Sequence, residues 1–91
     1  MITKEITVVN RLGLHARAAA QLVRRAGAFK SLIKLERLDA NASADAKSIL
    51  SLLMLAATRG TVLRIIVEGE DENEAYNSVS KLFEEGFGES N

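Results

Sequence analysis

The 91-residue chain contains no cysteine, no proline and no tryptophan, one histidine, and only 4% aromatic residues. Without cysteine it can form no disulfide and carry out no thiolate chemistry, and one histidine is too few for a structural zinc site. No apolar run approaches membrane-spanning length, and the N-terminus has no apolar signal region. We therefore expect one cytoplasmic domain spanning residues 1–91, without metal, cofactor or membrane insertion.

Acidic and basic residues balance at 12 each, but they are unevenly distributed. Residues 1–37 contain eight Lys or Arg and two acidic residues, whereas the remainder contains four and ten. The positive charge gathers near the only histidine, at Arg11, Arg17, Arg24 and Arg25. Such asymmetry suits an acidic or phosphorylated partner, and two ordinary solvated faces are the alternative explanation.

The segment at residues 10–20 carries the strongest chemical signal. A polar turn with Gly13 leads into an alanine-rich stretch that predicts a helix from Ala16, with His15 at its start. The first N–H groups of a helix lack intrahelical acceptors and carry positive partial charge, so they bind phosphate and favour a neutral imidazole. Arg17 adds a planar guanidinium suited to phosphate oxygens. We hypothesise that His15 accepts a phosphoryl group, held by the backbone of Ala16, Arg17 and Ala18. The alternative is an ordinary capping histidine beside a solvated arginine.

Period-two patterns predict strands at residues 2–9, 32–38, 42–44 and 61–68, and helical patterns follow Ala16, residue 48 and Asp71. Gly27 is the expected cap at the end of the first helix, and Asp45 or Ser48 begins the second. Asp71 and Glu74 resemble a capping box for the third helix, which Gly86 ends. Residues 88–91 are expected to form a loose tail.

The element order is therefore β-α-β-β-α-β-α. Right-handed crossovers then place the first and fourth strands side by side in a four-stranded antiparallel sheet with three helices on one face. The fold class is α+β. The other face is expected to be open and solvated, with polar residues at Thr3, Glu5, Thr7, Lys34, Glu36 and Arg64.

The second helix is unusually apolar. Eight of nine residues from Ile49 to Ala57 are apolar, and a domain this small cannot bury every side of such a helix. We expect part of the set Ile49, Leu50, Leu53 and Met54 to form an exposed docking patch. The alternative is that the whole helix lies buried under a loop.

The residues Asn10-x-x-Gly13-Leu14-His15-Ala16-Arg17 closely resemble the active-site motif of the histidine-containing phosphocarrier protein (HPr) family. The likeness continues through Ala46-Lys47-Ser48-Ile49, residues 55–61 and residues 68–75, and so covers essentially the whole chain. It implies an open-faced β-sandwich. It also implies a carrier of the bacterial phosphoenolpyruvate-dependent phosphotransferase system, not an enzyme with its own turnover.

The resemblance also assigns roles. It implies that Nδ1 of His15 accepts a phosphoryl group from Enzyme I, with assistance from Arg17, and passes it to IIA-type acceptor domains. Ser48 matches the position that a dedicated HPr kinase phosphorylates in many relatives, although an ordinary N-cap serine explains the residue as well. Ile49, Leu50, Leu53 and Arg24 would form the partner-binding surface of a protein that we expect to be monomeric.

Two departures from the family pattern stand out. Ala18 replaces a proline that would fix φ in the first turn, which affects the rigidity of the site more than its chemistry. The segment from Glu36 to Asp45 is about two residues longer than usual. Residues 52–55 and 82–87 look more like the nitrogen-related branch (NPr), whereas Lys47-Ser48 favours the sugar-uptake branch, and the branch stays open.

Three other function classes fit less well. An RNA-binding module of similar topology would stack bases on aromatic residues of its sheet, but the aromatic residues fall outside the predicted strands. A ligand-sensing domain of ACT type leaves the motif around His15 unexplained. An inactive relative that only binds partners would be indicated by loss of His15, which is present. We therefore expect no nucleic acid partner.

Overall fold

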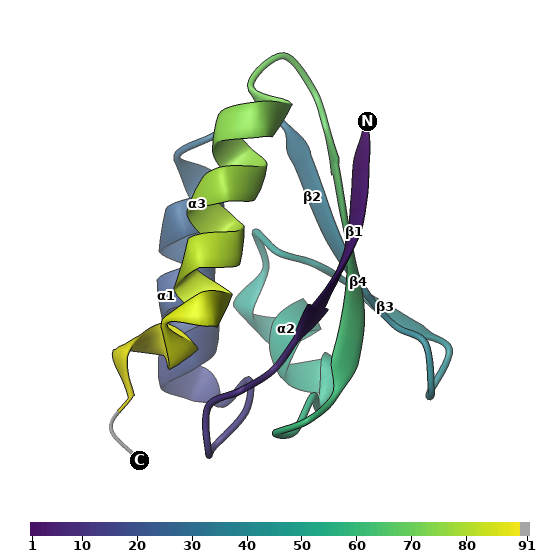
Figure 1. Ribbon diagram of the computed structural model, residues 1–91, viewed down its shortest axis with the longest axis vertical. Helices are drawn as coiled ribbons and strands as arrows, with labels where there is room; N and C mark the ends of the chain where they lie inside the picture. Colours follow the sequence, from purple (N-terminus) through teal and green to yellow (C-terminus); the bar gives the residue numbers. More distant parts are fainter. Residues whose placement is uncertain (90–91) are drawn as a thin grey trace.

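The computed structural model describes residues 1–89 and confirms the predicted element order. The elements are β1 (Ile2–Thr7), α1 (Ala16–Gly27), β2 (Leu32–Arg37), β3 (Ala42–Asp45), α2 (Ile49–Leu55), β4 (Val62–Glu68), α3 (Glu72–Glu84) and the 3₁₀ turn η1 (Gly86–Gly88). The strands form one antiparallel sheet in the order β1-β4-β2-β3, so the first and fourth strands are neighbours as expected. All three helices cover the same face of this sheet, and the other face is open (Figure 1).

Alternation along the strands decides which sheet face is covered. Ile33 and Leu35 of β2 and Leu63, Ile65 and Val67 of β4 are fully buried against the helices. The residues between them point to the open face, where Arg64 lies opposite both Glu5 and Glu36 in the strand register. Successive side chains of a strand point to opposite faces, so one sequence pattern supplies both an apolar and a polar surface.

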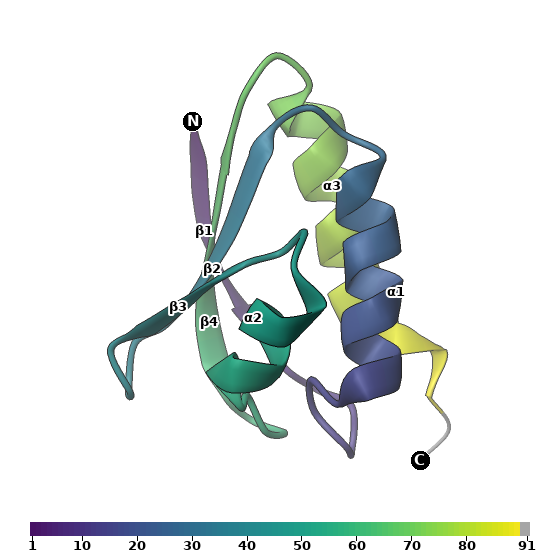
Figure 2. The ribbon, with the colours of Figure 1, turned by 180° about the vertical axis from the view of Figure 1, so that it is seen from behind.

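Apolar stripes on α1 and α3 complete the core. Ala18, Ala19, Leu22 and Ala26 of α1 are fully buried, and α3 contributes Ala75, Val79, Leu82 and Phe83. Viewed from behind, α1 lies in front of α3, and the shorter α2 lies to the left of α1 (Figure 2). The second helix buries Leu52 and Leu55 against this core.

The predicted cap of α1 and the predicted capping box of α3 are wrong. Gly27 is the last residue of α1 and not its cap, because the chain continues through Ala28 in a right-handed conformation. The helix α2 ends at Leu55, because Ala56 adopts a left-handed conformation with φ 53°. Asp71 is the N-cap residue of α3, as predicted, but its side chain makes no capping hydrogen bond. Its carboxylate instead accepts the N–H groups of residues 30 and 31 and the hydroxyl of Ser31, at 2.9, 2.9 and 2.5 Å.

The expected loose tail is also wrong for residues 88 and 89, and residues 90 and 91 lie outside the described part of the chain. After Gly86 ends α3, Phe87 turns back into the core and packs edge-to-face on Phe83, with ring centroids 5.0 Å apart. Gly86 lies next to Asn10 in the loop that precedes α1. In both ribbon views this turn lies at the same end of the molecule as that loop (Figures 1 and 2).

Candidate functional site

The loop from Asn10 to Leu14 sets the position of His15. Gly13 has φ +66°, and a Cβ atom added there would collide with the carbonyl oxygen of Ala57. This close approach lets the N–H of Leu14 donate to the same oxygen at 2.9 Å. The side-chain amide of Asn10 donates to the carbonyl of Gly13 at 2.8 Å and closes the loop from inside. The glycine is therefore required both by its backbone conformation and by the space available.

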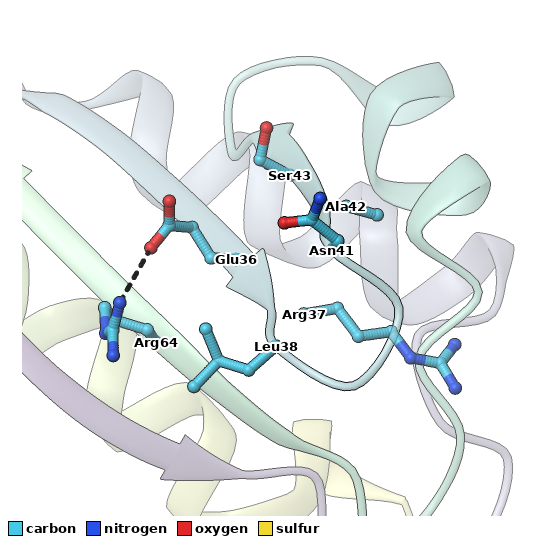
Figure 3. Close-up of a pocket in the computed structure, with 7 residues that line it drawn as sticks. All are labelled: Glu36, Arg37, Leu38, Asn41, Ala42, Ser43 and Arg64. Atoms are coloured by element: carbon cyan, nitrogen blue, oxygen red, sulfur yellow. Dashed lines mark hydrogen bonds and ion pairs between the residues drawn. The ribbon is translucent and has the colours of Figure 1, made fainter.

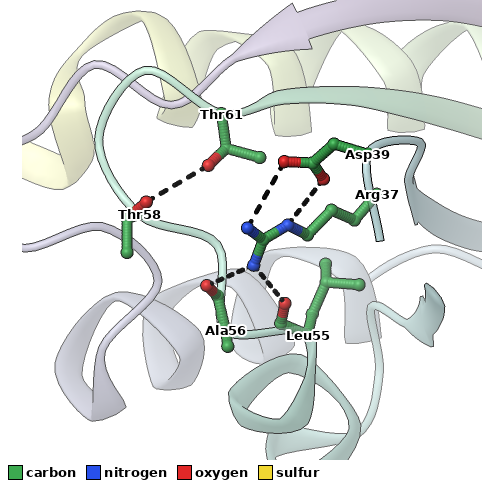
Figure 4. Close-up of polar contacts among 6 residues, drawn as sticks. All are labelled: Arg37, Asp39, Leu55, Ala56, Thr58 and Thr61. Atoms are coloured by element: carbon green, nitrogen blue, oxygen red, sulfur yellow. Dashed lines mark hydrogen bonds and ion pairs between the residues drawn. The ribbon is translucent and has the colours of Figure 1, made fainter. Parts of the chain in front are cut away.

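Arg37 holds the chain on the Ala57 side of the contact between Gly13 and Ala57. Its Nη1 atom donates to the carbonyl oxygens of Leu55 and Ala56 at 3.2 and 2.7 Å, at the end of α2 (Figure 4). Asp39 pairs with the same guanidinium at 2.7 Å from Nε, and this pairing raises the pKa of Arg37 and lowers that of Asp39. The clamped carbonyls immediately precede Ala57, which contacts Gly13. A residue of β2 thus supports the loop before His15.

His15 is the N-cap residue of α1, as the sequence predicts. Its backbone is extended and its carbonyl accepts the N–H of Ala19 at 2.8 Å, which begins the helix. The N–H groups of Ala16, Arg17 and Ala18 have no hydrogen-bond acceptor among residues 1–89. Ala16 and Arg17 are exposed, whereas Ala18 is buried; all three N–H groups lie at the positive end of α1, where an anion is stabilised.

The imidazole itself contacts Glu89, which sequence reasoning missed. Nε2 of His15 lies 3.1 Å from Oε2 of Glu89, and the histidine side chain is 27% exposed. The same carboxylate accepts from Nδ2 of Asn10 and from the N–H of Leu12, both at 3.0 Å. The bond from Asn10, followed by those from Leu12 and His15, lowers the pKa of Glu89. An aromatic residue between two glycines was the available signal that this tail is fixed.

The two arginines of the predicted site are placed differently. Arg17 is exposed in the first turn of α1, and the structure of residues 1–89 gives it no hydrogen bond or ion pair. Arg24 is also exposed and lines a hollow with Arg25 and Leu82, between α1 and α3. Arg24 makes no side-chain hydrogen bond or ion pair within residues 1–89, and its helix packs against α2 as well as α3. The structure therefore leaves both guanidinium groups available.

Ser48 is the N-cap residue of α2, which resolves the choice between Asp45 and Ser48. Its hydroxyl oxygen accepts the N–H of Ser51 at 3.2 Å, and its side chain is half-buried. The neighbouring Lys47 ammonium donates to the carbonyl of Phe29 at 2.8 Å, away from Ser48. Ser48 thus already has a structural role as a cap.

The exposed part of α2 matches the predicted docking patch. Leu50 and Met54 are 68% and 74% exposed, and Ile49 and Leu53 are 43% and 38% exposed. Leu52 and Leu55, on the opposite side of the helix, are buried. The alternative of a fully buried α2 is therefore wrong.

Other surfaces offer little to the chemistry. A hollow of about 220 Å³ at the β2–β3 hairpin is lined by Glu36, Arg37, Leu38, Asn41, Ala42, Ser43 and Arg64 (Figure 3). Its charged pair, Arg64 and Glu36, lies 3.5 Å apart and faces the open side of the sheet.

Within residues 1–89 no cluster of three acidic or histidine side chains could hold a metal ion, and no helix is long and apolar enough to cross a membrane. The four strands carry no aromatic residue, unlike an RNA-binding sheet.

Comparisons with known proteins agree with the motif. The family model described as "PTS HPr component phosphorylation site" matches residues 2–85. The phosphocarrier protein HPr of Xylella fastidiosa is 45% identical over 89 residues, 98% of each chain. A crystal structure of HPr-C-His from Thermoanaerobacter tengcongensis superposes with a TM-score of 0.93 at 38% identity, with full coverage of both chains. A structure of an HPr dimer from the same organism gives a TM-score of 0.76 at 40% identity, covering 92% of this chain and 94% of that one.

Proposed function

Because the chain belongs to the HPr family of phosphocarrier proteins, we propose that His15 accepts a phosphoryl group from Enzyme I and passes it to IIA-type domains. The protein is a carrier of the phosphotransferase system, modified once per cycle, and not an enzyme. The observation that carries the assignment to His15 is its position as N-cap of α1, beside three N–H groups without acceptors.

Each part of the helix start has a role in this proposal. Nδ1 of His15 attacks phosphorus, and the bond from phosphorus to the donor group of Enzyme I breaks. The N–H groups of Ala16, Arg17 and Ala18 bind the phosphoryl oxygens, which carry the negative charge. Ala18 adds a donor where the family's proline has none. The guanidinium of Arg17 reaches the same oxygens from its exposed position and stabilises the charge during transfer.

Intact-mass measurement after incubation with phosphoenolpyruvate and Enzyme I tests the proposal. We expect one acid-labile, base-stable phosphoryl group on the wild type and none on His15→Ala, which folds normally. Arg17→Ala should be phosphorylated more slowly, and an unchanged rate would remove Arg17 from the mechanism. Lack of phosphorylation by both the sugar-type and the nitrogen-related Enzyme I would refute the carrier role of His15.

The apolar residues Ile49, Leu50 and Leu53 form the proposed docking surface for Enzyme I and the IIA-type domains. Their exposure on one side of α2 supports this, because an unpaired apolar surface gains free energy when a partner covers it. Arg24 lies on another helix and would meet the rim of such a partner, where charge influences the association rate. Charge reversal at Arg24 should therefore slow association with little effect on dissociation.

Ser48 is the proposed regulatory site for an HPr kinase. A phosphate there would lie at the start of α2, next to Ile49. The ammonium of Lys47 would not be free to pair with it, because that group already donates to the carbonyl of Phe29. It would add negative charge beside the docking surface and weaken the binding of an acidic partner. Titration of Ser48→Asp with Enzyme I should show weaker binding, with Ser48→Ala as the control for loss of the cap. Equal affinity of the two variants would count against regulation.

We further propose that the carrier works as a cytoplasmic monomer. A one-to-one docking surface on α2 must be free for successive partners, and a stable dimer that covers it would block transfer. Sedimentation equilibrium at micromolar concentration should give a mass near 9.9 kDa. A concentration-independent mass of twice this value would refute the monomer.

A further inference from the structure

The Glu89 carboxylate binds the imidazole that the proposed function uses, yet the family match ends at residue 85. We propose that Glu89 is a positioning residue: it holds the imidazole proton on Nε2 and thereby leaves the electron pair of Nδ1 free to accept the phosphoryl group. This inference rests on the proposed role of His15, and its test separates the two.

The fold places Glu89 at the site and holds it there. Phe87 is buried against Phe83, and Gly86 packs beside Asn10 at the base of the loop. The N–H of Glu89 donates to the carbonyl of Gly86 at 3.0 Å, so the tail is turned back by a backbone bond. The residue is half-buried despite lying near the end of the chain. Its contact with His15 follows from a packed turn and not from a freely moving side chain.

Each group that contacts the Glu89 carboxylate is a hydrogen-bond donor. An ionised carboxylate only accepts hydrogen bonds, so Nε2 of His15 must carry the proton when it binds Glu89. The N–H of Leu12 fixes the other oxygen, and the amide of Asn10 shares Oε2 with the imidazole. The amide orientation of Asn10 is itself determined, because the flipped group would point its oxygen at two acceptors, Gly13 O and Glu89. This network selects the tautomer with a free Nδ1.

The same contact stabilises the charge that develops during transfer. When the neutral ring attacks through Nδ1, the N–P bond forms, the donor–phosphorus bond breaks, and the ring retains its Nε2 proton and becomes positive. The carboxylate at 3.1 Å then faces a cation, as the acidic residue does in a Ser-His-Asp triad. When the phosphoryl group leaves for the acceptor, the N–P electron pair returns to Nδ1 and the ring is neutral again.

Two variants test the tautomer directly. Glu89→Gln provides one acceptor oxygen in place of two, and its NH₂ group can donate to Nε2, which would move the ring proton to Nδ1. Glu89→Ala removes the contact altogether. Glu85→Gln is the matched control, because Glu85 is an exposed acidic residue of the same tail and its side chain makes no hydrogen bond within residues 1–89.

The first readout is the pair of ring ¹⁵N chemical shifts of His15 in unphosphorylated protein, at a pH where the ring is neutral. In the wild type and in Glu85→Gln, we expect a protonated Nε2 and an unprotonated Nδ1. In Glu89→Gln the two shifts should approach each other or exchange. The second readout is the rate of phosphorylation by Enzyme I, which should fall about tenfold in both Glu89 variants, as expected for loss of one charge-assisted hydrogen bond.

Each outcome is informative. Unchanged ring shifts in both Glu89 variants would overturn the inference, even if the rate falls, because the loss would then come from another source. An altered tautomer with an unchanged rate would overturn the link to phosphoryl transfer. If the shifts move as expected but the wild type is never phosphorylated, Glu89 still positions the ring and the proposed function of His15 fails instead.

Discussion

Substituting Gly13 by alanine tests the contact that connects α2 to the loop before His15. The residue has φ +66°, and the nearest atoms to an added Cβ all belong to the backbone of Ala57 and Thr58. Backbone atoms cannot rotate away as the end of a flexible side chain can. The loop must therefore shift, and the hydrogen bond from the N–H of Leu14 to Ala57 is the first to lengthen.

The expected magnitude is a sum of three effects. A left-handed conformation costs a residue with a Cβ about 1–2 kcal/mol, and overpacking typically costs about 1–3 kcal/mol. A more restricted unfolded chain returns about 0.4–1 kcal/mol. We expect Gly13→Ala to lower the free energy of unfolding by about 3 kcal/mol, which is a fall in Tm of about 15 °C for a domain of this size.

Two other glycines separate these contributions. Gly60 also has a positive φ, +89°, but an added Cβ would meet nothing within 4 Å. Gly60→Ala should therefore cost about 1 kcal/mol, from conformation alone. Gly27 lies in α1 with open space around it, and Gly27→Ala should stabilise the protein by about 0.5 kcal/mol. Urea unfolding with linear extrapolation gives the three values on the same scale.

The series also predicts a functional difference. Gly13→Ala displaces the backbone next to His15, so phosphorylation by Enzyme I should slow even at temperatures where the variant is fully folded. Gly60→Ala should be phosphorylated at the wild-type rate. If Gly13→Ala and Gly60→Ala lose equal stability, the contact with Ala57 contributes nothing and the steric reasoning is refuted.

The two sides of α2 and the start of α3 give two further predictions. Leu52→Ala should lower the free energy of unfolding by about 2–5 kcal/mol because the side chain is fully buried. Leu50→Ala should change stability by less than about 0.5 kcal/mol and instead weaken binding to Enzyme I in a titration. The reverse pattern would contradict the assignment of the two sides. The Ser31 hydroxyl and then the Lys30 N–H lower the pKa of Asp71 from 3.8 to about 2. Because the folded-state pKa lies below the unfolded value, this stabilisation is present above about pH 4 and is lost as the pH falls through 2. As the pH falls over that range, the urea midpoint of Asp71→Asn should fall less steeply than that of the wild type. Parallel plots of midpoint against pH for the two proteins would refute the linkage.

Local sequence patterns were sufficient to predict burial and exposure wherever the periodicity of one strand or helix determined which of its side chains face the core. Alternation along β4 correctly placed Arg64 on the open face, and Leu63, Ile65 and Val67 are buried on the other, because adjacent side chains of a strand face opposite ways. The mostly apolar sequence of α2 correctly predicted an exposed patch, because a small domain has no room to bury all sides of a helix. The start of α1 at His15 followed from the turn before it.

Local signals failed where a distant backbone group was the better partner. Asp71 has the residue spacing of a capping box, but its carboxylate binds the N–H groups of residues 30 and 31, which approach only in the folded chain. Gly27 looked like a helix cap, but the chain needs no left-handed turn there to enter β2. Such choices between equivalent donors depend on tertiary position, which the spacing of residues does not contain.

The sequence by itself determined the element order, the buried faces and the position of His15 at a helix start, because each depends on periodicity or on residues close along the chain. Only the tertiary structure decided what surrounds that histidine. Ala57 and Glu89 lie 42 and 74 residues away from it along the chain, and Arg37 acts on it through the end of α2. These groups meet because the core packs α2 and the C-terminal turn against the same loop, and the free energy of that packing is shared by the whole domain.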